Sequence, residues 1–350
     1  MTRRRPFQLR AGSLVLRMLG RDDVTTFSTY RNIAEVARYQ DWPLPYTRDL
    51  AHQLVDEMEL LGEPSEGAWT QLAMEFDGTM IGDYAIWLDD TGRLAMVGYT
   101  VDPRFQGRSH AVAATELVVD WLFTERGVHR IAATIDPRNA ASARVLERCG
   151  FEHVGTAREA AWSHGVWTDD TRFSLLEPQW RAWITRPTGM PTSVELVEVS
   201  ADNLDAVLAV ELAHSQRGVI RGPAESIAEA VHAARTPAPW YRAVVADGSV
   251  VGFVMVDEAV GRPPRVLRLI VDRRHQRRGI ASLTLTEFAR SVDHEHLEVV
   301  YPDDPGGPEV FYGRLGFLPT GERTADGQVV ARTRAAELSE RPVSAVGEQS

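Results

Sequence analysis

The sequence predicts an α/β fold of the mixed, α+β type, arranged as two tandem domains. Its 350 residues correspond to about two domains, at a typical length of about 150 residues each. An internal repeat supports the same number, because Val101-Asp-Pro-Arg-Phe-Gln-Gly-Arg-Ser-His-Ala111 aligns without gaps on Val271-Asp-Arg-Arg-His-Gln-Arg-Arg-Gly-Ile-Ala281 and shares six of eleven residues with it. Strand and helix patterns also follow one another in the same order in both halves.

A second shared motif indicates that the repeat spans a whole domain. Arg148-Cys-Gly-Phe151 follows the first copy at nearly the distance at which Arg314-Leu-Gly-Phe317 follows the second. Between the halves, residues 185–193 have the prolines, glycine and small polar residues typical of a linker. We therefore expect an N-terminal domain at 8–184, a linker at 185–193, a C-terminal domain at 194–336 and a disordered tail at 337–350.

The periodic pattern of the first half starts with a hairpin. Strands are predicted at Thr70–Phe76 and Met80–Leu88, on either side of the turn pair Asp77-Gly78. The elements predicted after this hairpin are strand Leu94–Val101, helix His110–Thr124, strand Arg130–Ile135 and helix Ala140–Cys149.

The second half repeats that order. Strands Tyr241–Ala246 and Val250–Val256 flank the turn at Asp247-Gly-Ser249. The apolar spacing within Gly279–Val292 is helical. The complete series after the hairpin is strand Arg265–Val271, helix Gly279–Val292, strand Leu297–Tyr301, short helix Pro308–Leu315 and a further strand that begins at Phe317.

Composition excludes several classes of protein. All 38 positively charged residues are arginine, so the sequence has no lysine for a pyridoxal phosphate enzyme, a P-loop NTPase or a protein kinase. The single cysteine, Cys149, excludes an intramolecular disulfide and multi-cysteine metal sites, and it fits a reducing, cytoplasmic location. We expect no bound metal.

Charge and hydropathy argue against two kinds of partner. No run of 18 apolar residues occurs, and no apolar stretch long enough for a signal peptide follows Met1, so we expect no membrane role. The net charge of −11 argues against a DNA-binding module.

In the second half, a strand, a glycine-containing loop and a helix are arranged in a way that suits a diphosphate. The first turn of a helix offers unpaired N–H groups and a positive dipole end, and a glycine lets the backbone approach an anion closely. Arginine side chains can add charge-assisted hydrogen bonds. We predict that such a ligand is bound by Ile270, Val271, Gln276, Arg277, Arg278, Gly279, Ile280 and Ala281.

Gln276-Arg-Arg-Gly-Ile-Ala281 resembles the acyl-CoA signature (Q/R)-x-x-G-x-(G/A) of the GNAT N-acyltransferase superfamily, and the resemblance covers most of both halves. The second half resembles general GNAT domains. The first half resembles the branch with ribosomal-protein N-terminal acetyltransferases, through Asn139-Ala-Ala-Ser-Ala-Arg-Val-Leu-Glu-Arg-Cys-Gly-Phe151 and Gly165-Val-Trp-Thr-Asp-Asp-Thr-Arg-Phe-Ser-Leu-Leu176. This resemblance implies a sheet splayed between its fourth and fifth strands, with the pantetheine of acetyl-CoA in the cleft, and direct attack of an amine on the thioester.

The first half departs from the signature at one position. Ser109 stands where the signature has glycine, and its Cβ disfavours both a positive φ and close approach of the backbone to a ligand. Its hydroxyl can still cap the following helix or bind phosphate. We therefore expect the two halves to bind coenzyme A unequally, the first through Gln106, Gly107, Arg108, Ser109 and Asn139.

The resemblance also implies catalytic roles. Tyr312 stands at the family's tyrosine acid, which returns a proton to the departing thiolate. In water this transfer is uphill by about 2 kcal/mol, and we expect burial of the thiolate to offset that cost. In the first half the matching candidate is Ser142, with Asn139 placed to bond the pantetheine or a water; local capping of the helix near Ala140 is the alternative for both.

A general base is harder to assign from the sequence. Asp257 and Glu258 end a strand beside the expected cleft, and we predict Glu258 as the base. A solvated hairpin end is the alternative interpretation of these two carboxylates.

Three functions remain compatible with the sequence. The first is transfer of an acetyl group from acetyl-CoA to an amine of a small molecule or a peptide. The second is aminoacyl transfer from charged tRNA in natural-product biosynthesis, which the arginines between Arg262 and Arg278 favour locally although the overall charge does not. The third is a non-catalytic CoA-binding module, against which Tyr312 argues, because binding alone does not require it.

Overall fold

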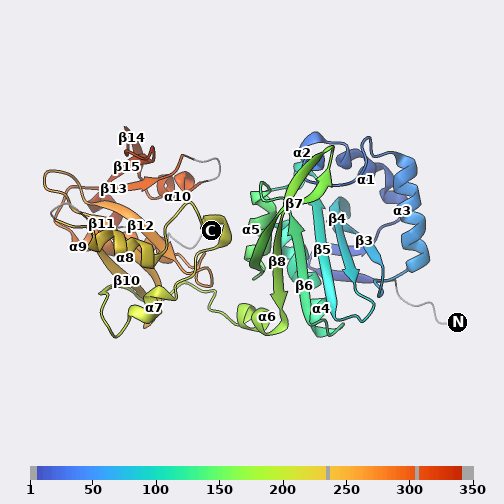
Figure 1. Cartoon of the computed structure of the whole chain (residues 1–350), viewed down its shortest axis with the longest axis horizontal. Helices are drawn as coiled ribbons and strands as arrows, with labels where there is room; N and C mark the ends of the chain where they lie inside the picture. Colours follow the sequence, from blue (N-terminus) through green and yellow to red (C-terminus); the bar gives the residue numbers. More distant parts are fainter. Residues whose placement is uncertain (1–5, 234–236, 304–306, 341–350) are drawn as a thin grey trace. The chain divides into compact units, whose positions relative to one another are not determined.

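The computed structural model describes residues 6–233, 237–303 and 307–340. The chain divides into two compact units, residues 1–185 and 186–350. Each unit holds one mixed β-sheet with helices packed against it (Figure 1), and this confirms the predicted fold class.

Eight strands form the sheet of the first unit, in the order β1-β2-β3-β4-β5-β6-β8-β7. Neighbouring strands are antiparallel, except that β5 and β6 are parallel. The strands are β1 (Gln8–Ala11), β2 (Leu14–Met18), β3 (Trp69–Phe76), β4 (Thr79–Leu88), β5 (Leu94–Val101), β6 (Arg130–Ile135), β7 (Glu152–Ser163) and β8 (Val166–Leu176).

Helices cover both faces of this sheet (Figure 1). Leu72 and Met74 pack with α4 on one face, whereas Ala73 packs with α1 to α3 on the other, because side chains alternate along a strand. The helices are α1 (Val24–Arg31), α2 (Ala34–Ala37), α3 (Arg48–Leu61), α4 (His110–Thr124), α5 (Ala140–Arg148) and α6 (Glu177–Ile184).

The sheet of the second unit has seven strands, in the order β14-β15-β13-β12-β11-β10-β9. Its parallel pair is β12 and β13. The strands are β9 (Val194–Glu198), β10 (Trp240–Ala246), β11 (Ser249–Asp257), β12 (Arg265–Val271), β13 (His296–Tyr301), β14 (Leu318–Arg323) and β15 (Val329–Arg334).

Helices also lie on both faces of the second sheet. Val254 and Val256 pack with α9, whereas Phe253 and Met255 pack with α7 and α8. The helices are α7 (Leu204–Leu208), α8 (Pro223–Val231), α9 (Ile280–Ser291), α10 (Glu309–Arg314) and α11 (Ala335–Ser339).

In both units the parallel pair of strands separates after a short stretch of pairing. Strands β5 and β6 pair only from Leu94 to Met96, and β12 and β13 pair only at Arg265 and Val266. The rest of β12 pairs with β11 on its other side but has no partner in β13. This separation is the splayed arrangement that the family resemblance implied.

The strand preceding each parallel pair carries a glycine at an equivalent place. A Cβ at Gly82 of β4 would lie 2.2 Å from the carbonyl oxygen of Thr100, and a Cβ at Gly252 of β11 would lie 2.3 Å from that of Ile270. Only glycine allows the two strands to approach this closely. The internal repeat therefore extends to the backbone contacts of the sheets.

The C-terminal end of the second unit differs from the expectation. Helix α11 covers Ala335–Ser339 and buries Leu338, because this side chain packs in the same core as α9. The disordered tail predicted from residue 337 was therefore wrong for residues 337–339, and residues 341–350 lie outside the described residues. No helix in the described parts of the chain has the length and apolar character needed to cross a bilayer.

Candidate functional site

A cavity of about 610 Å³ lies in the second unit where β12 and β13 separate. Its size is typical of a small-molecule site. The loop after β12, the start of α9, the end of β13 and α10 all contribute to its wall. The predicted residues that line it are Val271, Gln276, Arg277, Gly279, Ile280, Ala281 and Tyr312.

Two side chains fix the loop that follows β12. Asp272 is buried and accepts hydrogen bonds from the backbone N and the guanidinium of Arg274. The Gln276 amide donates a 3.1 Å hydrogen bond to the carbonyl oxygen of Val271. The signature glutamine therefore ties the loop to the end of its own strand.

The first unit makes the same contacts. Asp102 is buried and binds the backbone N and the guanidinium of Arg104, and the Gln106 amide donates a 2.9 Å hydrogen bond to Val101 O. The two loops are thus held by equivalent side chains 170 positions apart.

Both loops also contain two residues with a left-handed backbone, but the glycine occupies a different one in each. In the second unit φ is +63° at Arg277 and +73° at Gly279; in the first it is +74° at Gly107 and +62° at Ser109. The first unit therefore adopts the loop conformation despite Ser109. Gly279 precedes the first turn of α9. At this position the second unit has no Cβ, whereas the first unit has that of Ser109.

Arg278, which was expected to bind a phosphate, does not line the cavity. Its side chain is buried, its Nε donates to the carbonyl oxygen of Gly189 at 2.7 Å, and its Nη1 lies 2.8 Å from His275 Nδ1. It also forms an ion pair with Asp247 at 3.4 Å. Arg278 thus fastens the loop to neighbouring segments, and this placement does not support the prediction that it binds a phosphate.

The groups that remain at the loop fit a diphosphate. Helix α9 begins at Ile280, so its first turn presents backbone N–H groups beside the cavity. Arg277 and Arg314 line the cavity and bring positive charge. Arg314 was not predicted as a site residue, although it belongs to the shared Arg-x-Gly-Phe motif. Beyond the loop, the β12 edge that lacks a β13 partner offers backbone groups to the amides of a pantetheine arm.

Tyr312 lies in the wall of this cavity, on α10. Its ring stacks on that of Tyr301, with 5.3 Å between centroids, and contacts Phe317 edge-on. Burial raises the pKa of Tyr312 above its ordinary value, and the neighbouring Tyr301 adds to this. The phenol therefore stays protonated throughout the neutral and mildly alkaline range.

Two predicted residues of the second unit lie away from the cavity. The side chain of Ile270 packs in the core that contains Phe253 and Met255, and Ile270 does not line the cavity. Glu258 is exposed beyond the end of β11, which pairs with the start of β12, and it is also absent from the cavity wall. The prediction of Glu258 as the base beside the cleft is not supported by this placement, and the solvated hairpin end describes it.

In the first unit, Asn139 and Ser142 lie together at the start of α5. Asn139 Oδ1 accepts a 3.1 Å hydrogen bond from the backbone N of Ser142, which is the capping role considered as an alternative. Ser142 Oγ lies 3.0 Å from the hydroxyl of Tyr99, a β5 residue that was not predicted as part of a site. Burial raises the pKa of Tyr99 above its ordinary value.

Ser109 has a different partner from those expected. Its hydroxyl makes no hydrogen bond that caps α4, and it accepts a 3.1 Å hydrogen bond from Arg148 Nη1. The preceding residues Gln106, Gly107 and Arg108 are also exposed.

The two units differ in register at the position of the candidate acid. Five residues before Phe317 stands Tyr312, and five residues before Phe151 stands Leu146, which is fully buried. Ser142 lies one helical turn earlier, at the position equivalent to Pro308. Ser142 therefore does not stand at the position of Tyr312 in the repeat, and its role as the acid of the first unit stays a prediction.

Comparisons with known proteins agree with this arrangement. Two family models, both described as "Acetyltransferase (GNAT) domain", match residues 13–152 and 212–331. The "Probable N-acetyltransferase YjcK" of Bacillus subtilis is 38% identical over 104 residues, which are 29% of this chain and 58% of the relative. The "[Ribosomal protein uS5]-alanine N-acetyltransferase" of Escherichia coli is 30% identical over 84 residues, which are 24% of this chain and 43% of the relative.

The chain thus spans about half the length of these curated relatives. A solved ribosomal L7/L12 alpha-N-protein acetyltransferase in complex with coenzyme A is 20% identical, with 49% of this chain and 98% of that chain covered and a TM-score of 0.45. Proteins of the matched family use acetyl-CoA. The two family matches, in tandem on two mixed sheets, show that the chain belongs to the GNAT acetyltransferase superfamily.

Proposed function

We propose that the second unit is an N-acetyltransferase that transfers the acetyl group of acetyl-CoA to an amine. One observation carries this proposal: a single cavity brings together the loop at Gly279, the unpaired edge of β12 and the buried hydroxyl-bearing ring of Tyr312. Donor binding and proton donation are thereby available at one site.

The residues of the loop have distinct tasks in this proposal. The first-turn N–H groups of α9 and the guanidinium of Arg277 bind the diphosphate. Gln276 and Asp272 position the loop through their contacts with Val271 and Arg274.

Acetyl-CoA supplies the acetyl group as a thioester. A neutral amine forms the new bond from its nitrogen to the carbonyl carbon, and the carbon–sulfur bond breaks. The amine gives up one proton to water, and Tyr312 gives one proton to the thiolate sulfur before regaining one from solvent. Burial raises the pKa of Tyr312 as well as that of a thiol, so a buried thiolate recovers only part of the uphill cost.

The described residues of the cavity wall include no carboxylate. An α-amine with a pKa near 8 is roughly one-tenth neutral at pH 7 and reacts without a strong base. We therefore propose that water takes the amine proton and that no carboxylate of the cavity wall does so.

For the first unit we propose weaker binding of coenzyme A and a supporting role. Ser109 places a Cβ where the second unit has none, and Leu146 replaces the tyrosine acid. The hydroxyl pair of Tyr99 and Ser142 is our candidate proton donor in this unit.

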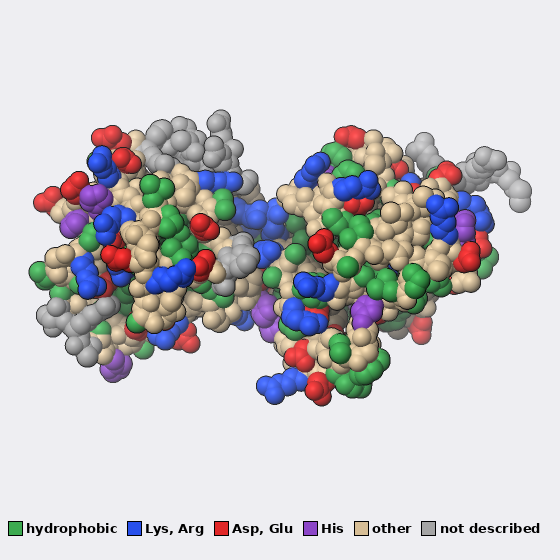
Figure 2. Space-filling view, turned by 90° about the horizontal axis from the view of Figure 1, so that it is seen from above, with side chains coloured by type: hydrophobic (Ala, Val, Ile, Leu, Met, Phe, Trp, Pro, Cys, Tyr) green, Lys and Arg blue, Asp and Glu red, His purple; other side chains and the backbone are tan. Residues whose placement is uncertain are grey.

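An amine acceptor is consistent with the printed names of the relatives, one of which acts on an alanine of ribosomal protein uS5. A tRNA-bound donor would require many phosphate contacts. On the face that Figure 2 shows, acidic and basic side chains are interspersed on each unit, which favours free acetyl-CoA as the donor.

The direct test is release of free thiol from acetyl-CoA by the purified protein in the presence of a panel of amines. We expect release that resists ribonuclease and changes only mildly between 50 and 200 mM salt. Transfer that requires charged tRNA and disappears after ribonuclease would replace this proposal with an aminoacyltransferase. Coenzyme A binding without transfer to any amine would leave a binding module.

A further inference from the structure

We propose that the acceptor of the second unit is an amine that also carries a carboxylate, and that Arg268 binds this carboxylate. The inference rests on the proposed acetyltransferase function and names the class of its acceptor. Four observations support it: the position of Arg268, its unused donor, its contrast with two neighbouring arginines and the charge of the cavity wall.

Arg268 lies on β12 in the stretch that has no β13 partner, and it lines the cavity. Its guanidinium reaches α8, where Nη2 donates to Glu229 Oε2 at 3.2 Å. Tyr312, which also lines the cavity, packs in the core on the α9 face of the sheet. The cavity wall therefore includes residues from both faces of the sheet, Tyr312 from one and Arg268 from the other.

Not every hydrogen-bond donor of the Arg268 guanidinium has a partner among the described residues. Its Nη1 donates to the carbonyl oxygen of Leu267 at 2.7 Å, and its Nη2 makes the contact with Glu229. The Nε atom is buried and has no hydrogen-bond partner among the described residues. A buried donor without a partner is costly, and Nε with Nη2 forms the fork that binds a carboxylate in a bidentate manner.

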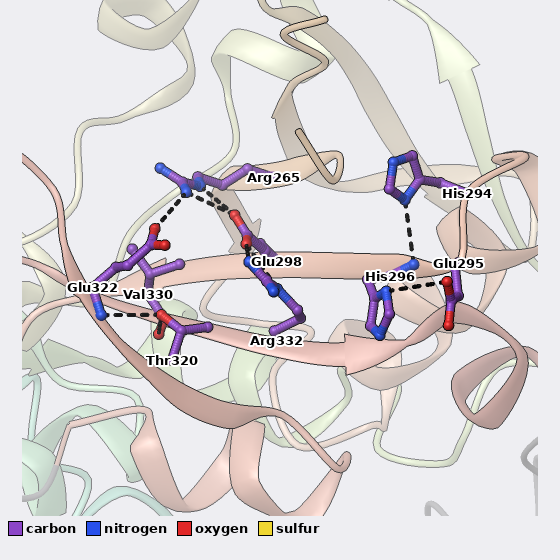
Figure 3. Close-up of polar contacts among 9 residues, drawn as sticks. All are labelled: Arg265, His294, Glu295, His296, Glu298, Thr320, Glu322, Val330 and Arg332. Carbon is purple, nitrogen blue, oxygen red and sulfur yellow. Dashed lines mark hydrogen bonds and ion pairs between the residues drawn. The ribbon is translucent and has the colours of Figure 1, made fainter. Parts of the chain in front are cut away.

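In two other arginines of the same sheet, Nε and Nη2 both donate hydrogen bonds to a carboxylate (Figure 3). Arg265 donates from Nε and Nη2 to Glu298 Oε2 at 2.9 and 2.7 Å, and Arg332 donates from the same two atoms to Glu298 Oε1 at 3.0 and 2.6 Å. Glu298 is buried between them. Arg265 and Arg332 therefore donate from both atoms to a carboxylate within the protein, whereas Nε of Arg268, a residue of the cavity wall, has no partner among the described residues.

The charge of the cavity wall favours an anionic group. The arginines Arg268, Arg277 and Arg314 line it, and no Asp or Glu does so among the described lining residues. His275, which also lines it, has its pKa lowered by burial. A nearby positive charge also disfavours a protonated amine, so Arg268 increases the neutral, reactive fraction of an acceptor bound beside it.

Glu229 is shared between two arginines. Arg221 Nη1 donates to the same Oε2 atom at 2.9 Å. A second carboxyl, Asp326, lies outside the cavity wall, and its pKa is lowered by a hydrogen bond from Thr324 and also by the charges of both guanidinium groups. Arg221 is largely exposed and does not line the cavity, and this makes it a matched control for Arg268.

The first unit has no equivalent residue. The ladder places Arg268 opposite Met255, and the equivalent pair in the first unit is Gly98 opposite Ala85. The proposed selectivity for a carboxylate therefore belongs to the second unit alone.

The test compares acetylation of matched acceptors by the full chain. The acceptors are the common amino acids and dipeptides, each as the free carboxylate and as the C-terminal amide, with products measured by mass spectrometry and kcat/KM determined for the best pair. We expect the carboxylate form to be preferred by about 10- to 100-fold, as one charge-assisted contact would give. Arg268→Gln should remove this preference mainly through KM for the acceptor, and Arg268→Lys should retain part of it. Arg221→Gln should leave it unchanged.

The affinity for coenzyme A, measured by calorimetry, reports whether each variant is folded, and we expect it to stay within about twofold of the parent. Equal turnover of carboxylates and amides, or a preference that survives Arg268→Gln, would overturn the role of Arg268 while the acetyltransferase function stands. Absence of transfer to every amine, with coenzyme A still bound, would overturn both.

Discussion

The two units build the same loop with the glycine at different positions. Asp102 and Gln106 hold the first loop as Asp272 and Gln276 hold the second, and both loops have two left-handed residues. The loop conformation therefore depends on these side-chain contacts and does not require glycine at the signature position. Glycine at 279 determines instead how closely a ligand can approach the start of α9.

The units differ similarly at the candidate acid. Tyr312 and Leu146 occupy equivalent buried positions, so the core accepts an aromatic or an aliphatic side chain there. What changes is the hydroxyl group. In the first unit, Tyr99 on β5 and Ser142 in the first turn of α5 place two hydroxyl groups 3.0 Å apart.

The largest expected effect comes from closing the approach to α9. Gly279→Glu places a Cβ and a negative charge beside the diphosphate, so the tight coenzyme A site should weaken by about 100-fold or more, or about 2.7 kcal/mol. Calorimetric titration measures it. Ser109→Glu is the matched change in the first unit and should leave the tight site intact. If Ser109→Glu abolishes the tight site and Gly279→Glu does not, the assignment of the two units is reversed.

Removing the phenolic proton tests the second difference. Tyr312→Phe keeps the stacked ring and should lower kcat by about 100-fold with little change in KM for acetyl-CoA, because the hydroxyl acts on the leaving sulfur. Steady-state thiol release gives both constants. Ser142→Ala is the control and should change kcat by less than about twofold if the second unit carries catalysis. The opposite result would move the reaction to the first unit.

The pH dependence should separate the acid from the acceptor. The pKa of Tyr312 is raised by burial, so its active, protonated form persists to higher pH than an ordinary tyrosine would allow. We expect kcat/KM to rise as the amine loses its proton and to show no falling limb up to about pH 10. A decline centred below pH 9 would indicate that a group other than Tyr312 supplies the proton.

Sequence reasoning located the repeated core accurately because its signals are local. Strand Leu94–Val101, helix His110–Thr124 and strand Arg265–Val271 have the predicted bounds, since strand alternation or helical spacing is strong in each. Helices α1 to α3 and strands β7 and β8 were not predicted, although they complete the first unit.

Site residues could be predicted where a sequence motif contains them, but not where their position depends on tertiary contacts. The signature located Gly279 and Arg277 in the cavity wall. The same signature could not show that Arg278 turns away to Gly189 and Asp247, because both partners are distant in the sequence. Arg268 lies in an ordinary strand pattern, and only the separation of β12 from β13 brings it to the cavity.

The smallest expected effect concerns strain in the loop of the first unit. Ser109 has a left-handed backbone, which costs an L-residue about 1 kcal/mol, and glycine removes this cost. Glycine also has more freedom in the unfolded chain, and the hydrogen bond from Arg148 to the Ser109 hydroxyl is lost, so the net gain in the free energy of unfolding should stay below about 1 kcal/mol. Ser109→Gly should nevertheless strengthen coenzyme A binding in the first unit, because it removes the Cβ that stands where the ligand approaches.

The matched change in the second unit is Arg277→Gly, at the other left-handed position of its loop. It relieves comparable strain but removes a cation from the cavity wall, so it should weaken the tight site. Thermal unfolding and calorimetry on the two variants test both statements. Weaker binding after Ser109→Gly would show that the serine hydroxyl, and not the space it occupies, determines what the first unit binds.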